Sequence, residues 1–218
     1  MYIYVKRVID FVMALVLLIV LFIPMIIIGI AIKLDSKGPV FFKQIRTGKN
    51  GKDFLLYKFR SMVVDNDVHD FSRGDKHTKV GTFLRKTSLD EIPQLINILK
   101  GDMSFIGPRP WIPDYYQSMN IRQRHRYDVL PGITGLAQAK GRNDISIFAK
   151  INYDLEYVKN ISLLYDIKVV FWTIETVLSK VGADAGKSTI QLELETLKTQ
   201  ELQVIHEEDY YPESIGKI

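Results

Sequence analysis

An apolar run near the N-terminus constrains the fold of this chain more than any other feature. Residues 11–32 carry no charged side chain. As an α-helix the run is about 33 Å long, which matches the hydrocarbon core of a bilayer. A cleaved signal peptide fits poorly, because the apolar core is too long and no small-residue cleavage site ends it. We therefore expect residues 1–36 to form a membrane segment.

The residues alone leave open how this segment meets the membrane. Pro24 lies near the middle of the run, where a proline removes one helical hydrogen bond and bends the helix. Basic residues flank both ends, so the positive-inside rule favours neither orientation. They are Lys6, Arg7, Lys33, Lys37 and Lys43. The segment either spans the bilayer or enters one leaflet and returns, with both ends on the cytoplasmic side.

The charge of the chain is modest overall but unevenly distributed. The net charge is +4, and the chain contains no cysteine, which excludes disulfides and thiolate chemistry. A basic segment directly after the apolar run indicates an anionic membrane surface rather than nucleic acid, although a merely solvated surface is the alternative. Its basic residues are Lys33, Lys37, Lys43, Arg46, Lys49, Lys52, Lys58 and Arg60, against Asp35 and Asp53.

A β-hairpin is predicted across this basic segment. Two β-rich runs, within residues 38–44 and 53–62, flank an Asn-Gly turn. The alternation of side chains places Lys58 and Arg60 on one face, which suits either a phosphate or solvent. Residues 65–78 follow as a polar surface loop.

The strongest chemical signal is the acidic pair Asp90–Glu91. It precedes a short apolar stretch, and a helix that starts at Asp90 places Pro93 in the first turn, where proline is tolerated. Carboxylates here suit a divalent cation, and the positive end of a helix suits phosphate. The structural alternative is an N-cap at Asp90, or a capping box between Ser88 and Glu91.

Several cations and one glycine-rich turn surround this pair in the sequence. A short helix at 80–86 brings Arg85 close, and Arg109 is held between two prolines. Residues 114–129 read as one polar helix. The turn at 130–135 either lets backbone amides approach an anion or forms a tight connection, and Arg142 lies in the loop after it.

The C-terminal part is predicted to contain helices at 146–159 and 162–180. The second carries an apolar stripe that either closes a core or lies in a membrane interface. The stripe consists of Leu163, Leu164, Ile167, Val170, Phe171, Ile174, Val177 and Leu178. We divide the chain into the membrane segment 1–36, a cytosolic domain 37–185 and an acidic appendage 186–218.

Several long motifs follow one another in a fixed order along the chain. They are the apolar N-terminus with Pro24, YKFRSM at 57–62, SLDEIPQLIN at 88–97, KGDMSFIGPRP at 100–110 and PGITGLAQ at 131–138. Together they resemble the bacterial sugar transferase family, the monotopic phosphoglycosyl transferases. The resemblance covers roughly residues 4–180, close to the short form that holds only the catalytic domain.

This resemblance implies a fold, an activity and a set of site residues. The fold is α+β and mostly helical, with a re-entrant helix-break-helix, a small hairpin and interfacial amphipathic helices. The activity is transfer of a sugar 1-phosphate from a UDP-sugar to undecaprenyl phosphate, with release of UMP. Asp90 is the implied nucleophile, forming an aspartyl phosphosugar, and Glu91 helps it to hold Mg²⁺. The implied phosphate-binding residues are Arg109, Arg85, Lys58, Arg60 and Arg142.

The same resemblance implies a location and leaves two other functions to be weighed. It places the protein at the cytoplasmic face of the bacterial inner membrane, in contact with phospholipids. A homo-oligomer is compatible with the resemblance. A non-catalytic membrane scaffold and a nucleotide-sugar hydrolase are the alternatives. One departure concerns the membrane break, where relatives often have Ser-Pro and this chain has Ile23-Pro24.

Overall fold

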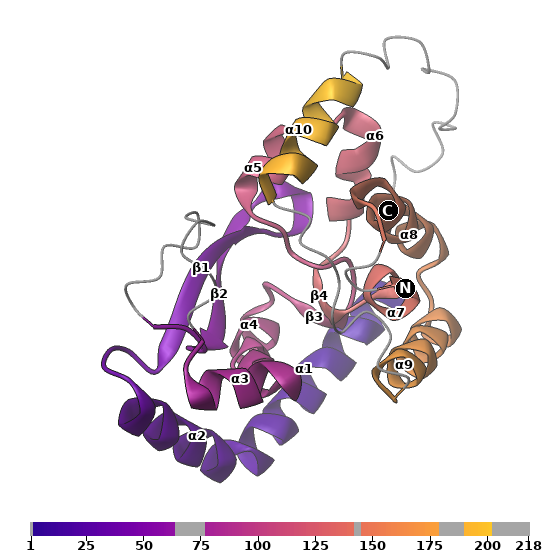
Figure 1. The fold of residues 1–218 in the computed structure, drawn as a ribbon. Coiled ribbons are helices and arrows are strands. Elements are labelled where there is room, and N and C mark those ends of the chain that lie inside the picture. The colour runs from indigo at the N-terminus through magenta and orange to yellow at the C-terminus, as the bar shows by residue number, and fades with distance from the viewer. Residues whose placement is uncertain (1, 64–76, 142–144, 179–189, 202–218) are drawn as a thin grey trace.

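The computed structural model describes residues 2–63, 77–141, 145–178 and 190–201. The described part is mostly helical with small sheets, as the sequence predicts. Helices α1 (Tyr2–Val20) and α2 (Phe22–Asp35) form one end of the molecule, and α10 (Ile190–Glu201) lies at the other (Figure 1). The hairpin and the short elements between residues 79 and 106 lie between these ends.

The expected break in the apolar run is confirmed. Among the described residues, α1 and α2 reach the length and apolarity of a membrane-crossing segment only when taken together, and they are bent by 61°. Pro24 lies in the first turn of α2, and its ring excludes the helical position of the Val20 carbonyl four residues earlier. Leu21 at the bend keeps both backbone bonds, to the Leu17 carbonyl and from the Met25 amide, each 2.8 Å. No hydroxyl before Pro24 is needed for these bonds.

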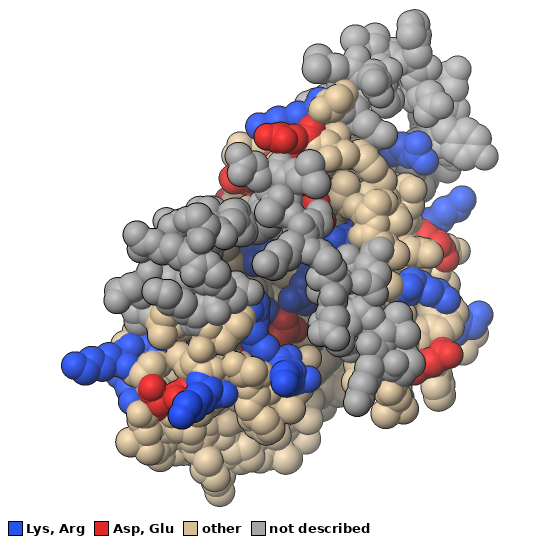
Figure 2. Space-filling model, viewed as in Figure 1, with Lys and Arg blue, Asp and Glu red and all other residues tan. Residues whose placement is uncertain are grey.

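Three helices expose large apolar side chains at this end of the molecule. In Figure 2 the lower end, where α1 and α2 meet in Figure 1, is covered by uncharged side chains on the visible face. Helix α9 (Leu163–Leu178) also exposes its predicted stripe, with Leu164 73% and Phe171 68% exposed. The stripe therefore does not close the core, and Val169 on the opposite side is the buried apolar residue of this helix.

The predicted hairpin is confirmed. Strand β1 (Phe41–Thr47) pairs antiparallel with β2 (Asp53–Phe59), in a register that sets Phe41 opposite Phe59. The turn η1 (Lys49–Gly51) has φ of 57° at Asn50 and 71° at Gly51. These positive values explain the Asn-Gly sequence, because asparagine and glycine tolerate this conformation better than other residues.

The short elements that follow pack the hairpin against α1. They are α3 (Lys79–Lys86), η3 (Leu89–Glu91) and α4 (Gln94–Lys100). Ala14 of α1, fully buried, packs with Leu95 and Ile98 of α4. Arg7 donates to the carbonyls of Ile98 and Leu99, and so it caps the C-terminal end of α4. The bent apolar helix pair and the rest of the described fold thus share one core.

The glycine-rich turn forms a tight connection. Strands β3 (Ser104–Ile106) and β4 (Gly132–Thr134) pair in parallel. The amide of Gly107 donates to Thr134, and that of Gly132 donates to Pro108, both at 2.9 Å. A Cβ on Gly132 would lie 2.2 Å from the Gly107 nitrogen, so the two loops touch through bare backbone. The amides of Gly107 and Gly132 therefore bond to backbone carbonyls and are not free to bind an anion.

The single polar helix predicted over 114–129 is wrong. The structure has α5 (Pro113–Gln117), α6 (Ile121–Arg124) and η4 (His125–Tyr127) instead. The break has a local cause, because Asn120 and Gln123 form a capping box that starts a new helix. The short α7 (Leu136–Gly141) follows β4. The predicted helix at 146–159 is confirmed as α8 (Ile147–Asn160), with Ser146 as its N-cap.

A buried polar network joins the start of α1 to α9 and β3. Asp166 of α9 accepts hydrogen bonds from Tyr2 and Lys6, the latter at 2.7 Å. Tyr157 donates both to Asp166, at 2.7 Å, and to the carbonyl of Ile106 at the end of β3, at 3.1 Å. The charges are paired within the network, which offsets the cost of burying them. It fixes the start of α1 to the strand that leads into the Arg109 loop.

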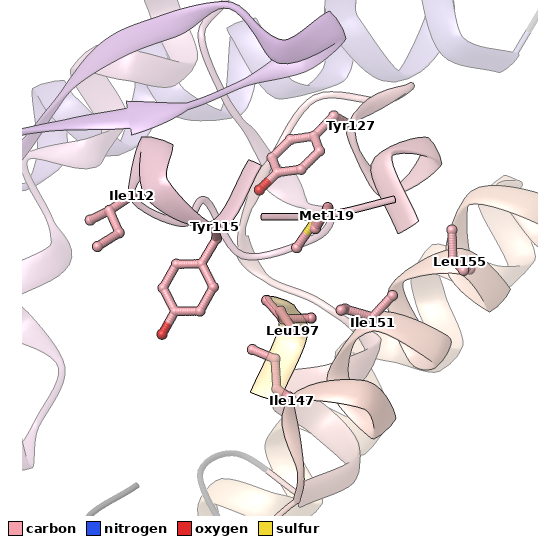
Figure 3. Packing of buried hydrophobic residues seen from close by; sticks show 8 residues of the cluster. All are labelled: Ile112, Tyr115, Met119, Tyr127, Ile147, Ile151, Leu155 and Leu197. Carbon is pink, nitrogen blue, oxygen red and sulfur yellow. The ribbon is translucent and has the colours of Figure 1, made fainter. Parts of the chain in front are cut away.

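Helix α10 packs onto the globular domain, although its residues belong to the predicted appendage. Leu197 is 1% exposed and lies among Tyr115, Ile147 and Ile151 (Figure 3). Glu193 accepts a hydrogen bond from the Tyr115 hydroxyl at 2.6 Å and pairs with Lys150 at 3.0 Å. The described part of the tail is therefore a structural element against α5 and α8.

Candidate active site

Asp90 and Glu91 lie in the 3-10 turn η3, before helix α4. The sequence-based start of the helix at Asp90 is wrong, and α4 begins at Gln94 with Pro93 as its N-cap. The helix start is not an open anion site, since the amides of Leu95 and Ile96 already donate to the preceding turn. The capping-box alternative is also wrong, because the side chain of Ser88 makes no capping hydrogen bond.

The backbone before the acidic pair is strained. Ser88 has φ of 57° and ψ of 17°, in the left-handed region that non-glycine residues rarely adopt. Strain of this kind is concentrated at functional sites, where surrounding contacts hold it in place. At this position it turns the chain between α3 and η3 and so directs Asp90 and Glu91.

Glu91 bridges two cations from separate elements. Its Oε1 accepts from Lys58 Nζ at 2.6 Å and from Arg109 Nη2 at 2.8 Å. Burial alone raises the pKa of Glu91, but the charges of Arg109 and Lys58 outweigh it and lower the pKa to about 2. Glu91 is therefore ionised at neutral pH. Burial and the nearby Arg109 lower the pKa of Lys58, while Glu91 opposes that shift.

The position of Lys58 depends on a buried asparagine. Asn97 of α4, fully buried, accepts from the Tyr57 amide at 3.1 Å and donates to the Leu55 carbonyl at 2.8 Å. One side chain thus satisfies two backbone groups on the edge of β2, as a neighbouring strand would. This fixes β2 to α4 and sets Lys58 beside η3.

The position of Arg109 depends on another buried residue, which the sequence-based reasoning missed. Arg126 donates to the Arg109 carbonyl at 2.8 Å and to Asp154 Oδ2 at 2.9 Å and 2.7 Å. Its guanidinium lies 3.9 Å from the centre of the Trp111 ring. Arg126 and Asp154 are both buried, so their ion pair is shielded from water. The pair fixes the guanidinium of Arg126, which in turn holds the backbone of the Arg109 loop.

Asp90 is 7% exposed and is chemically different from its neighbour. Among the described residues, no side chain forms an ion pair or hydrogen bond with its carboxylate. Burial raises the pKa of Asp90, and the charge of Glu91 adds to this, whereas Lys58, Arg85 and Arg109 lower it. Arg85 lies on α3 and contacts His77 Nε2 at 2.8 Å. Asp90 is thus the less strongly neutralised of two adjacent acids.

The structure places the other two predicted phosphate ligands elsewhere or leaves them undescribed. Arg60 is 5% exposed and donates to the carbonyls of Ile32, Lys37 and Ser36 at the C-terminal end of α2. These hydrogen bonds hold its guanidinium at the end of α2, and its role at a phosphate stays a prediction. Arg142 lies outside the described residues.

A small pocket that is open to solvent lies beside the Glu91 bridge. Lys58 and Arg109 line it together with Arg46 of β1. The sequence-based reasoning had placed Arg46 only in the basic segment. The alternation of side chains in the hairpin could have predicted this position. Arg46 lies opposite Phe54, and Phe54 is on the same face of β2 as Lys58, four residues further along. The remaining lining residues are Leu56, Gln94 and Pro110.

The acidic pair fits Mg²⁺ only if a substrate supplies further oxygens. Within the described ranges, no cluster of three or more acidic, histidine or cysteine side chains could enclose a metal. Both cations bind Oε1 of Glu91, which leaves its Oε2 and the carboxylate of Asp90 without an ion-pair partner among described residues. Mg²⁺ commonly takes one or two carboxylates plus substrate phosphates and water, so these two residues suit it.

Together these features place two adjacent acids and a group of cations in one part of a fold that also contains a bent apolar helix pair. The sequence pattern of the family described as bacterial sugar transferase matches residues 1–180. The chain belongs to the bacterial sugar transferase family.

Three relatives illustrate the similarity. The chain is 46% identical to the uncharacterized sugar transferase EpsL of Bacillus subtilis, over 69% of this chain and 76% of that protein. It is 44% identical to the UDP-N-acetylgalactosamine-undecaprenyl-phosphate N-acetylgalactosaminephosphotransferase of Aeromonas hydrophila, over 84% of this chain and 45% of that protein. It is 43% identical to the UDP-glucose:undecaprenyl-phosphate glucose-1-phosphate transferase of Escherichia coli, over 78% of this chain and 39% of that protein. The match thus spans less than half of the latter two proteins.

Proposed function

We propose that this protein transfers a sugar 1-phosphate from a UDP-sugar to undecaprenyl phosphate and releases UMP. The observation that carries the proposal is the pair of adjacent acids, of which Glu91 is neutralised by Lys58 and Arg109 while Asp90 is not. The names of the relatives support the two substrates. This would be a first membrane step of glycan assembly.

The chemistry divides into two displacements at one phosphorus. A carboxylate oxygen of Asp90 attacks the phosphorus that bears the sugar, and the bond from that phosphorus to the bridging oxygen breaks, so UMP leaves. An oxygen of the acceptor phosphate then attacks the same phosphorus and displaces Asp90, which regains its charge. A covalent intermediate of this kind replaces one difficult transfer by two easier steps.

The cations assist by offsetting negative charge. Lys58 and Arg109 face the same pocket and stabilise the phosphoryl oxygens during both displacements. Arg85 also acts on Asp90 through its charge. Asp90 and Glu91 would hold Mg²⁺, which supplies further charge neutralisation when it is bound.

The acceptor requirement separates this function from the hydrolase and scaffold alternatives. We expect UMP release from a UDP-sugar to depend on added polyprenyl phosphate, because water is a poor competitor in a site built for a phosphate nucleophile. The measurement is steady-state UMP release by the detergent-purified full chain, with and without the acceptor lipid. Equal release without the lipid would support a hydrolase, and no release under either condition would support a scaffold.

The exposed apolar ends of α1, α2 and α9 support attachment to the cytoplasmic face of the inner membrane. With a re-entrant helix pair, cysteines introduced at Tyr4, 80% exposed, and at the exposed Lys37 should both resist impermeant thiol reagents in intact cells. Both should react after the cells are opened. The native chain has no cysteine and is the blank for this experiment. Labelling of only one position in intact cells would show a spanning segment instead.

A further inference from the structure

Arg46 is a cation in the pocket that the proposed chemistry has not yet used. It lines the pocket with Lys58 and Arg109. Its Nη1 donates to the Pro110 carbonyl at 3.3 Å, and its Nη2 donates to Gln44. Its Nε is buried and has no partner among the described residues. Arg46 also forms no ion pair with any described acid.

The charge around the pocket is unbalanced. Three cations line it, and no acid does. Glu91 pairs with Lys58 and Arg109, and its single negative charge neutralises at most one of the three positive charges. Burial and the charge of Arg109 lower the pKa of Arg46 to about 10, so the protein alone does not favour this arrangement. A cation kept beside another cation without an acid indicates that an anionic ligand completes the site.

The position of Arg46 relative to Asp90 indicates which anion it binds. The charges that act on Asp90 come from Lys58, Glu91, Arg85 and Arg109. Arg46 is not among them, and it donates instead to the carbonyl of Pro110, which lines the pocket next to Arg109. A diphosphate has two phosphates in sequence, and only the one that bears the sugar meets Asp90. The second phosphate must therefore lie further along the same pocket.

We propose that Arg46 binds the phosphate of the nucleoside monophosphate that leaves in the first displacement. The inference rests on the proposed function and adds a leaving-group subsite to it. In the donor complex Arg46 holds the phosphate next to the nucleoside, and it offsets the charge that this phosphate gains when the bridging bond breaks. The planar guanidinium suits a phosphate, because two of its N–H groups bind two oxygens at once.

A structural role for Arg46 makes a different prediction. If Arg46 only held the Pro110 carbonyl, its loss would disturb the whole pocket, and uridine and UMP would be affected alike. If it contacts the leaving phosphate, only the ligand that carries a phosphate is affected. The test therefore compares the two ligands in one variant.

The experiment is equilibrium binding of UMP and of uridine to the detergent-purified full chain, by calorimetry. For Arg46→Gln we expect UMP affinity to fall roughly 10- to 100-fold, with uridine affinity unchanged. Arg46→Lys keeps the charge without the fork and should lose less UMP affinity than the glutamine variant. Arg122→Gln, which removes one charge from an exposed position on α6, is the matched control and should bind both ligands like the native chain.

Each other outcome overturns the inference. Unchanged UMP affinity in Arg46→Gln, or an equal loss for uridine and UMP, would leave Arg46 as a structural residue, with the proposed transfer intact if Asp90→Asn still abolishes turnover. Absence of UMP binding to the native chain, together with absence of transferase activity, would remove the proposed function as well. If Arg46→Gln does not fold, Arg46→Met decides, because it also removes the charge, and native-like UMP affinity in it would contradict the phosphate contact.

Discussion

Asp90→Asn is expected to lower kcat for sugar-phosphate transfer by at least roughly 1,000-fold, because the amide cannot serve as the attacking carboxylate. The substitution keeps the shape of a side chain that is 7% exposed, and no described residue pairs with its charge. Folding and binding to membranes should therefore be retained. The measurement is UMP release in the presence of polyprenyl phosphate, alongside membrane flotation of the variant.

A matched control separates the loss of Asp90 from the general effect of removing one negative charge. Asp114→Asn removes one carboxylate from the exposed first turn of α5 and should leave kcat within about twofold of the native value, as expected for a surface change. If Asp90→Asn kept a substantial share of native turnover, Asp90 would no longer be the nucleophile.

Glu91→Gln is expected to lower kcat/KM by about 100-fold or more, since the cations that Glu91 orients lose their shared partner. The pH profile should change as well. Burial and the charge of Glu91 raise the pKa of Asp90, so activity in the native enzyme is lost as the pH falls through that raised value. Removing the charge of Glu91 and releasing Lys58 and Arg109 both lower the pKa of Asp90. The acidic limb of the profile should therefore move to lower pH.

The measurement is kcat/KM as a function of pH for the native chain and the variant. Glu175→Gln, on the exposed face of α9, serves as the control and should keep the native profile. An acidic limb that stays in place or moves to higher pH in Glu91→Gln would contradict the electrostatic coupling between the two acids.

The parts of the fold that were predictable are those set by neighbours in sequence. The Asn-Gly turn, the break at Pro24, the helix with its cap at Ser146 and the exposed stripe on α9 follow from local patterns. The start of α4 was misplaced because a tolerated Pro93 was counted inside the helix, whereas its missing N–H separates η3 from α4.

The site itself was only partly predictable, since its supports are remote in sequence. Asp90, Glu91 and Arg109 were recognised from their motifs. Asn97 contacts residues about forty positions away, and Arg126 pairs with Asp154, 28 positions away. Such contacts depend on tertiary packing, which no local pattern encodes. The contacts of Arg60 could not be predicted for the same reason, because its alternation with Lys58 predicts a shared face but not that α2 ends beside it.

The most direct test of the covalent mechanism is mass spectrometry of the intact enzyme with Mg²⁺ and a panel of UDP-sugars, in the absence of any acceptor lipid. The account predicts an added sugar phosphate on Asp90 for at least one donor, with one UMP released for each adduct, and no adduct on Asp90→Asn. Turnover that requires polyprenyl phosphate, without an adduct for any donor, would contradict the intermediate and show direct transfer between the two bound substrates.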